Sequence, residues 1–139
     1  MENFEKQKKQ HEEDHEQKED KRFLDEINEI FKKNPIKFYE DSGVESNKKI
    51  DNVKSISSDK SGTGGKIGIE FTYDDYVSVN KKSFNSGGVF NYSRMKIDDE
   101  SFHNILTAMD KLIKKSGYSE VEKEKMFNMV VDKLDQKKK

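Results

Sequence analysis

The amino-acid sequence predicts an α+β domain with a long charged N-terminal helix, a small antiparallel sheet of three to four strands and a C-terminal helical hairpin. Three observations lead to this prediction. Apolar residues recur at helical spacing before residue 34 and after residue 101, and they alternate with polar residues in the middle of the chain. Turn-forming residues separate these segments. The length of 139 residues is that of one domain, which we expect to span 23–139, behind a charged arm, 1–22.

The arm at 1–22 holds eight acidic and six basic residues, and only Met1 and Phe4 among them are large and apolar. Opposite charges four residues apart, as at Glu2 and Lys6, stabilise a helix by about 0.2–0.5 kcal/mol per pair. A helix with no apolar face is marginal on its own. We therefore expect the arm to be a helical extension of the segment that follows it.

That following segment carries a single apolar stripe on one helical face. The stripe consists of Phe23, Leu24, Ile27, Ile30 and Phe31. We expect the helix to end at the Asn34-Pro35 step, because the residue before a proline disfavours the helical conformation.

The middle of the chain has the pattern of a sheet. Apolar residues at 67, 69, 71 and 73 alternate with other residues, which predicts a half-buried strand. Asp74-Asp75 then separates it from a second short strand, Tyr76 to Asn80, so we expect a hairpin. A third strand, Val89 to Met95, is expected after a loop that ends in two glycines, and Ile50, Val53 and Ile56 are expected to supply a preceding strand. The segment 57–65 is predicted to be a flexible loop.

The C-terminal third predicts two helices. The first has an apolar stripe made of Phe102, Ile105, Leu106, Met109, Leu112 and Ile113, with acidic residues at 98–100 before it and Gly117 closing it. Ser119 and Glu122 predict a capping box for the last helix. The stripe of that helix is Phe127, Val130, Val131 and Leu134. The short link between the helices favours an antiparallel hairpin.

Composition excludes several classes of function. Charged residues make up 40% of the chain, but 27 basic residues against 28 acidic ones give a net charge of −1, without the basic excess of a dedicated duplex-binding protein. The absence of cysteine removes disulfides, thiolate catalysis and sulfur-bound zinc. No segment has the pattern of a signal peptide or a membrane span, so we expect a cytoplasmic protein. Lysine far outnumbers arginine, as in proteins of low-GC bacteria, their phages and plasmids.

Two motifs resemble known sites without meeting their requirements. His11-Glu12-Glu13-Asp14-His15 has the spacing of a zinc hydrolase, but charged residues surround it and no third ligand follows nearby, so we interpret it as part of a solvated charged helix. The segment 61–66 lacks the first glycine and the final Ser or Thr of a phosphate-binding loop. We interpret it as a plain loop, with weak anion contact as the alternative.

The remaining ionisable residues also have structural explanations. His103 lies at the start of a predicted helix with no serine elbow or oxyanion hole to complete a triad, so we expect it to be a partly exposed helical residue. The acidic runs at 74–75 and 98–100 are explained by turn chemistry and the helix dipole. We accordingly predict a protein that is not an enzyme, with no catalytic residue, metal or cofactor.

Two functions stay open, and a binding protein is favoured. The first is a small non-enzymatic protein, such as an inhibitor or accessory protein of a phage or mobile element, that engages a larger protein or a protein–nucleic-acid complex through charged surfaces. Its candidate partner-binding residues are Glu12, Glu13, Asp14, Glu16, Glu19, Asp20, Asp74 and Asp75. The alternative is a single-stranded nucleic-acid-associated protein that uses aromatic and basic residues of the sheet, because stacking beside cations holds single strands. Its candidates are Lys66, Tyr76, Lys81, Lys82, Tyr92 and Arg94. A homodimer is a further alternative, and no membrane partner is expected.

Overall fold

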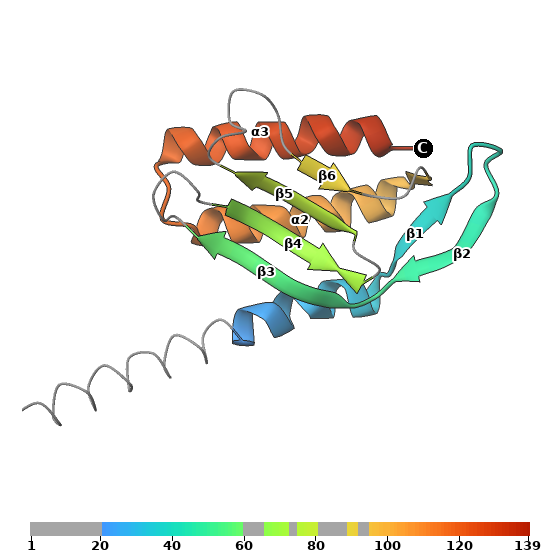
Figure 1. The fold of residues 1–139 in the computed structure, drawn as a ribbon, viewed down its shortest axis with the longest axis horizontal. Helices are drawn as coiled ribbons and strands as arrows, with labels where there is room; N and C mark the ends of the chain where they lie inside the picture. The colour runs from blue at the N-terminus through green and yellow to red at the C-terminus, as the bar shows by residue number, and fades with distance from the viewer. Residues whose placement is uncertain (1–20, 60–65, 73–74, 81–88, 92–94) are drawn as a thin grey trace, which may run out of the picture.

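The α+β class is confirmed by a computed structural model, which describes residues 21–59, 66–72, 75–80, 89–91 and 95–139 (Figure 1). Within these residues, a first helix covers 21–33. The elements after it are β1 (Ile36–Tyr39), β2 (Glu45–Ile50), β3 (Val53–Asp59), β4 (Lys66–Phe71), β5 (Tyr76–Asn80), β6 (Val89–Asn91), β7 (Lys96–Ile97), α2 (Asp99–Lys115) and α3 (Glu120–Lys137). The predicted extension of the first helix into the charged arm lies outside the described residues.

The strands form two small antiparallel sheets instead of the single sheet that we predicted. One has the order β2-β1-β7 and the other the order β3-β4-β5-β6. The strand expected before the hairpin is confirmed as β3, which contains Val53 and Ile56 and pairs antiparallel with β4. The inclusion of Ile50 is wrong, because Ile50 ends β2 of the other sheet. Val53 and Ile56 both reach the core despite their spacing of three, because the register shifts between Val53 and Ser55. A two-residue break at 51–52 lets Ile50 and Val53 both enter the core from different sheets.

The predicted hairpin of the middle segment is confirmed. β4 and β5 pair antiparallel with Ile69 opposite Val77, and β5 pairs with β6. The described part of the third strand is shorter than the predicted Val89–Met95, since β6 covers Val89–Asn91 and Met95 lies outside any strand. The predicted loop 57–65 is wrong at its start, because 57–59 belong to β3 and pair with β4. Serine does not prevent pairing there, because the ladder uses backbone groups, with Ser57 opposite Gly68 and Ser58 opposite Ile67.

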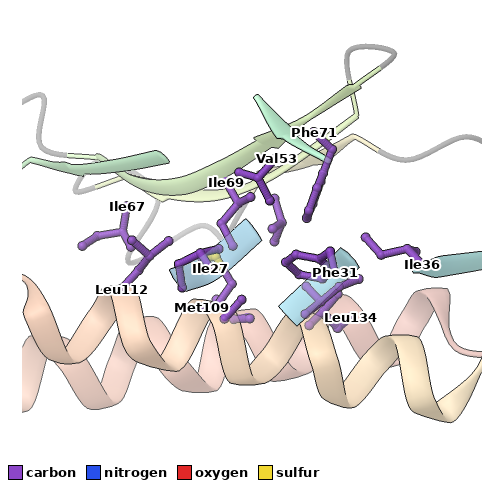
Figure 2. Packing of buried hydrophobic residues seen from close by; sticks show 14 of the residues in the cluster. Ile27, Phe31, Ile36, Val53, Ile67, Ile69, Phe71, Met109, Leu112 and Leu134 are labelled. Carbon is purple, nitrogen blue, oxygen red and sulfur yellow. The ribbon is translucent and has the colours of Figure 1, made fainter. Parts of the chain in front are cut away.

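The hydrophobic core fills the space between the four-stranded sheet and the helices. Figure 2 shows Ile67 and Ile69 of the sheet facing Met109 and Leu112 of α2, with Ile27 and Phe31 of the first helix among them. All of these side chains are buried. Figure 1 shows α2 and α3 side by side behind the sheet and running in opposite directions, which confirms the predicted helical hairpin. No helix of the described chain lies on the other face of this sheet.

The ends of the C-terminal helices follow local chemistry, with two differences from the prediction. Asp98 caps α2, and the capping box of Ser119 and Glu122 begins α3 as expected. Closure by Gly117 is wrong. Instead Ser116 is the C-cap, and its amide and hydroxyl donate to carbonyls of the last turn. On α3 the buried residues are Met126, Val130 and Leu134, whereas Phe127 and Val131 are half-buried. The stripe is rotated because Met126, Val130 and Leu134, each four residues from the next, share the helix face that meets the core.

Candidate binding face of the four-stranded sheet

The outer face of the four-stranded sheet is polar. Ile67, Ile69 and Phe71 of β4 and Val77 and Val79 of β5 are buried against the helices. Because successive residues of a strand point to opposite faces, the residues between them lie on the outer face. These are Gly68 and Glu70 of β4, with Tyr76 and Ser78 of β5. This face is turned towards the viewer in Figure 1.

Strand register arranges the outer residues in two rows. Ser55, Glu70 and Tyr76 stand opposite one another across β3, β4 and β5, and Ser57, Gly68 and Ser78 form the neighbouring row. Together these six residues, with Ile69, line a shallow hollow of about 370 Å³. The hollow exists because the second row carries no side chain larger than serine.

At Gly68, β4 lies very close to β5. A Cβ atom placed on Gly68 would lie 2.6 Å from the Cβ of Ser78 and 3.0 Å from the carbonyl oxygen of Val77. Since the second of these atoms belongs to the backbone, it cannot turn aside as the end of a side chain can. Glycine here permits the close approach of β4 to β5, which is the usual reason for a glycine inside a strand.

Among the described residues that line the hollow, the charged side chain is that of Glu70. Its Oε2 accepts a hydrogen bond of 3.0 Å from the hydroxyl of Ser55, and its Oε1 lies 3.2 Å from Nζ of Lys54. The Glu70 side chain is 40% exposed and that of Lys54 is 62% exposed. These two neighbours orient the carboxylate.

Asp75, a candidate partner-binding residue, has its carboxylate inside the protein. The residue is 4% exposed, and Nζ of Lys48 lies 2.6 Å from its Oδ2. Lys48 also lies over the ring of Phe38, 5.1 Å from the centroid. The ion pair joins β2 of one sheet to the start of β5 of the other, so Asp75 contributes to the fold and is not displayed on the surface. The other candidates of this set, at 12–14, 16, 19–20 and 74, lie outside the described residues.

Tyr76, a nucleic-acid candidate, lies on the outer face, where it is half-buried beside Glu70. Lys66 lies in β4 opposite Asn80. Lys81, Lys82, Tyr92 and Arg94 lie outside the described residues. Phe71, an aromatic residue of the same region, is fully buried and packs edge-on against Phe31 with ring centroids 5.1 Å apart. It is therefore a core residue and is not available to stack on bases.

Asp98, the first residue of an acidic run, is engaged in capping. Its Oδ1 accepts from the amide of Ser101 at 2.8 Å and its Oδ2 from the hydroxyl of Tyr39 at 3.2 Å. Burial alone would raise the pKa of Asp98, but these hydrogen bonds, the Ser101 hydroxyl and the charge of Lys37 outweigh it and hold the pKa below its ordinary value. Partial burial and the Asp98 charge raise the pKa of Tyr39. This is the chemistry of a helix cap, which agrees with the structural explanation of the acidic run predicted from the sequence.

The other motifs provide no site in the described part of the chain. His103 is exposed on α2, with its ring edge-on to Phe102, which agrees with the expected helical residue. The HEEDH motif at 11–15 lies outside the described residues, as does 61–65 of the glycine-rich segment. Among the residues that the structure describes, no group of three or more His, Cys, Asp or Glu side chains is placed to hold a metal ion.

The sequence analysis predicted one residue of the outer face, Tyr76, as part of the nucleic-acid alternative, but it did not predict the hollow. Gly68 and Glu70 alternate with Ile67 and Ile69, so their placement opposite the core could be derived. The contributions of Ser55, Ser57 and Ser78 depend on strand register, which no local pattern gives.

No helix of the described residues is long and apolar enough to cross a membrane. Comparison of the chain with models of protein families, with curated proteins and with solved structures finds no match.

Proposed function

We propose that this protein is a non-enzymatic binding module that engages a larger protein partner through the outer face of its four-stranded sheet. The observation that supports the proposal is the difference between the two faces. One face is covered by helices and apolar, whereas the other is polar, uncovered by any described helix and hollowed along Ser57, Gly68 and Ser78. Concave surfaces with a few convergent polar groups are the usual places for a ligand.

The size of the face indicates that it is one part of a larger contact. Four strands about 4.8 Å apart and about five residues long cover a patch of roughly 14 by 17 Å, or about 240 Å². A specific protein interface covers about 800 Å² on each partner. The partner must therefore touch further surfaces, and the charged arm, with Glu12, Glu13 and Asp14, is the natural second contact. An inhibitor or accessory protein of a phage or mobile element would have this character.

Electrostatics favours a protein over a nucleic acid as the partner. Glu70 supplies the charge among the described residues of the hollow, and a carboxylate repels the phosphates that supply most of the affinity for nucleic acid. The described aromatic group of the face, Tyr76, stands directly beside it. The experiment below also tests the alternative function, in which the face binds single-stranded nucleic acid.

The test uses immobilised full-length chain to capture partners from a lysate of the organism that encodes it. Ser57→Trp would fill the hollow from a half-buried edge position, and we expect it to reduce capture at least tenfold. Val121→Trp is the matched control, because Val121 is 64% exposed on α3, away from the sheet. Melting curves of both variants check that the fold is kept.

Equal capture by the two variants would refute the outer face as the docking surface. Tight binding of single-stranded oligonucleotides at about 50 mM salt, lost on Tyr76→Ala, would replace the protein partner by a nucleic acid. Deletion of 1–20 is expected to weaken capture while leaving the melting temperature of the domain unchanged.

A further inference from the structure

We infer that one edge of β7 is a recognition site for an extended basic segment of another protein, and that the chain's own residues Lys138 and Lys139 occupy this site. These two residues are called the tail below. The partner segment is a stretch of protein with two consecutive lysines, and it binds only when the tail leaves. The site belongs to the three-stranded sheet, so the inference does not depend on the outer face of the four-stranded sheet.

The backbone of the tail lies along β7 as an added strand would. β7 pairs with β1 on one side, and on its other side Ile97 forms a parallel bridge with Lys138. The amide of Lys139 donates a hydrogen bond of 2.8 Å to the carbonyl oxygen of Ile97. Extended peptides bind to the edges of sheets in this way, through hydrogen bonds between main chains. The structure therefore shows both the edge and the kind of segment that it accepts.

Each lysine of the tail has its charge against an aromatic ring. Nζ of Lys139 lies 4.1 Å from the ring centroid of Tyr39, and Nζ of Lys138 lies 5.2 Å from that of Phe102. Tyr39 belongs to β1 and Phe102 to α2, so the fold itself sets the distance between the two rings. The face of an aromatic ring attracts a cation within about 6 Å. Main-chain pairing does not distinguish side chains, whereas the two rings favour cations at consecutive positions.

Two carboxylates at the start of α2 strengthen this preference in different ways. Oδ1 of Asp99 lies 3.1 Å from Nζ of Lys138 and pairs with its charge. Oδ2 of Asp98 accepts a hydrogen bond of 3.2 Å from the hydroxyl of Tyr39, which holds the ring in the position where it meets Lys139. A strand edge, two rings and a carboxylate thus converge on two adjacent lysines. This combination is the chemistry that would recognise a dilysine segment of a partner.

The contacts that hold the tail are weak enough to be exchanged. The side chain of Asp99 is 74% exposed and that of Lys138 is 35% exposed, and Lys139 is an exposed residue. Ion pairs at such exposure contribute little to stability, because water and salt screen them. The advantage of the tail over a partner segment is that it follows α3 directly and has a high effective concentration at the site. A partner with the same chemistry competes with the tail, and its affinity falls in proportion to the fraction of molecules whose site is vacant.

The experiment compares the unaltered chain with a variant whose tail cannot occupy the site. This opened variant is Lys138→Ser/Lys139→Pro, which removes both cations and the amide that donates to Ile97. Both ¹⁵N-labelled full chains are titrated with the acetylated and amidated peptide Asp-Gln-Lys-Lys-Lys, which copies residues 135–139, and amide chemical shifts are recorded. We expect the peptide to shift the amides of Ile97 and Asp99 in the opened variant, with a dissociation constant of about 1 mM at low salt. It should bind the unaltered chain about tenfold more weakly.

Further variants test the recognition of lysine. A peptide with glutamine in place of its last two lysines should bind the opened variant about fivefold more weakly, because the contacts of both cations are lost. Adding Tyr39→Leu or Asp99→Asn to the opened variant should weaken the lysine peptide about threefold or twofold. Glu120→Gln, at the other end of α3, is the control for the loss of a carboxylate. Lys32→Ser/Lys33→Ser, in the exposed last turn of the first helix, is the control for the loss of two lysines and should behave as the unaltered chain.

Three outcomes would overturn the inference. Equal affinity of the opened variant for the lysine and glutamine peptides would refute recognition of a basic segment. Equal affinity of the opened variant and the unaltered chain for the lysine peptide would refute occupation of the site by the tail. Absence of binding to the opened variant, or shifts that spare β7 and α2, would refute the site itself. None of these results bears on the outer face of the four-stranded sheet, which Ser57→Trp tests separately.

Discussion

Replacement of Gly68 by alanine tests the geometry of the outer face, because two physical effects predict opposite signs. Alanine in place of glycine in a strand ordinarily stabilises a protein by about 0.5–1 kcal/mol through loss of unfolded-state freedom. At Gly68 the new methyl group would lie 2.6 Å from the Cβ of Ser78, 3.0 Å from the oxygen of Val77 and 3.2 Å from the Cα of Ser78. Overpacking of this kind costs about 1–3 kcal/mol. We therefore expect a net destabilisation of about 1–2 kcal/mol.

The assay is urea denaturation of Gly68→Ala, Ser78→Gly and the double variant. Ser78→Gly removes the atom at 2.6 Å but leaves the backbone contacts, so the double variant should recover part of the loss caused by the methyl group. A coupling energy of about 0.5–1 kcal/mol between the two changes is expected. If Gly68→Ala alone stabilises the protein, β4 and β5 do not approach each other closely at Gly68. The requirement for glycine at this position of the hollow is then refuted.

Three further predictions concern stability away from the hollow. Lys48→Met should destabilise by about 2–3 kcal/mol in urea denaturation, because it leaves the carboxylate of Asp75 buried without its cation, and the Lys48→Met/Asp75→Leu pair should recover most of that loss. If the double variant recovers none of the lost stability, Lys48 and Asp75 are not energetically coupled. Because the folded pKa of Asp98 lies below its unfolded value, its ionised form adds stability above about pH 4 that is lost as the pH falls through the lower, folded pKa. Asp98→Asn keeps a capping side chain and should flatten the acid limb of a melting-temperature profile; an unchanged limb contradicts this. Ser119→Ala should cost about 1 kcal/mol by removing the capping box of α3, and no change in the denaturation midpoint would argue against the cap.

The parts of the fold that the sequence predicted are those with a strong local period. The helices have apolar stripes several turns long, and the alternation around Ile67 is carried by residues that are all buried. The first sheet had no such signal. β1 has four residues, β7 has two, and in β2 five residues precede the single buried one, Ile50. Such strands are specified by their partners and by the core, not by their own pattern.

The site was less predictable because it depends on contacts between distant residues. An acid at Asp75 beside a turn is expected to be exposed, and only the fold brings Lys48, from a different sheet, to pair with it. The row of Ser55, Glu70 and Tyr76 likewise depends on the bulge at the start of β3, because a shift of one residue would turn Ser55 to the core. Neither the ion pair of Asp75 nor the row of outer residues can be predicted from the residues next to each of them in the sequence.

The chemistry of the outer face indicates which kind of association it can support. A face that waits for a permanent helix or a second sheet is apolar, since obligate interfaces resemble a divided core. Here the partly exposed residues Ser55, Ser57, Glu70 and Tyr76 are polar, so the free protein presents them without an aggregation hazard. Binding through such a surface gains little free energy from the burial of apolar area and more from oriented charges. We therefore expect the association with the partner to be reversible. Salt screens exposed charges that are more than a Debye length apart, and this length is about 10 Å at 0.1 M salt. Binding that depends on Glu70 should therefore weaken steadily as the salt concentration rises, whereas binding through apolar contacts would not.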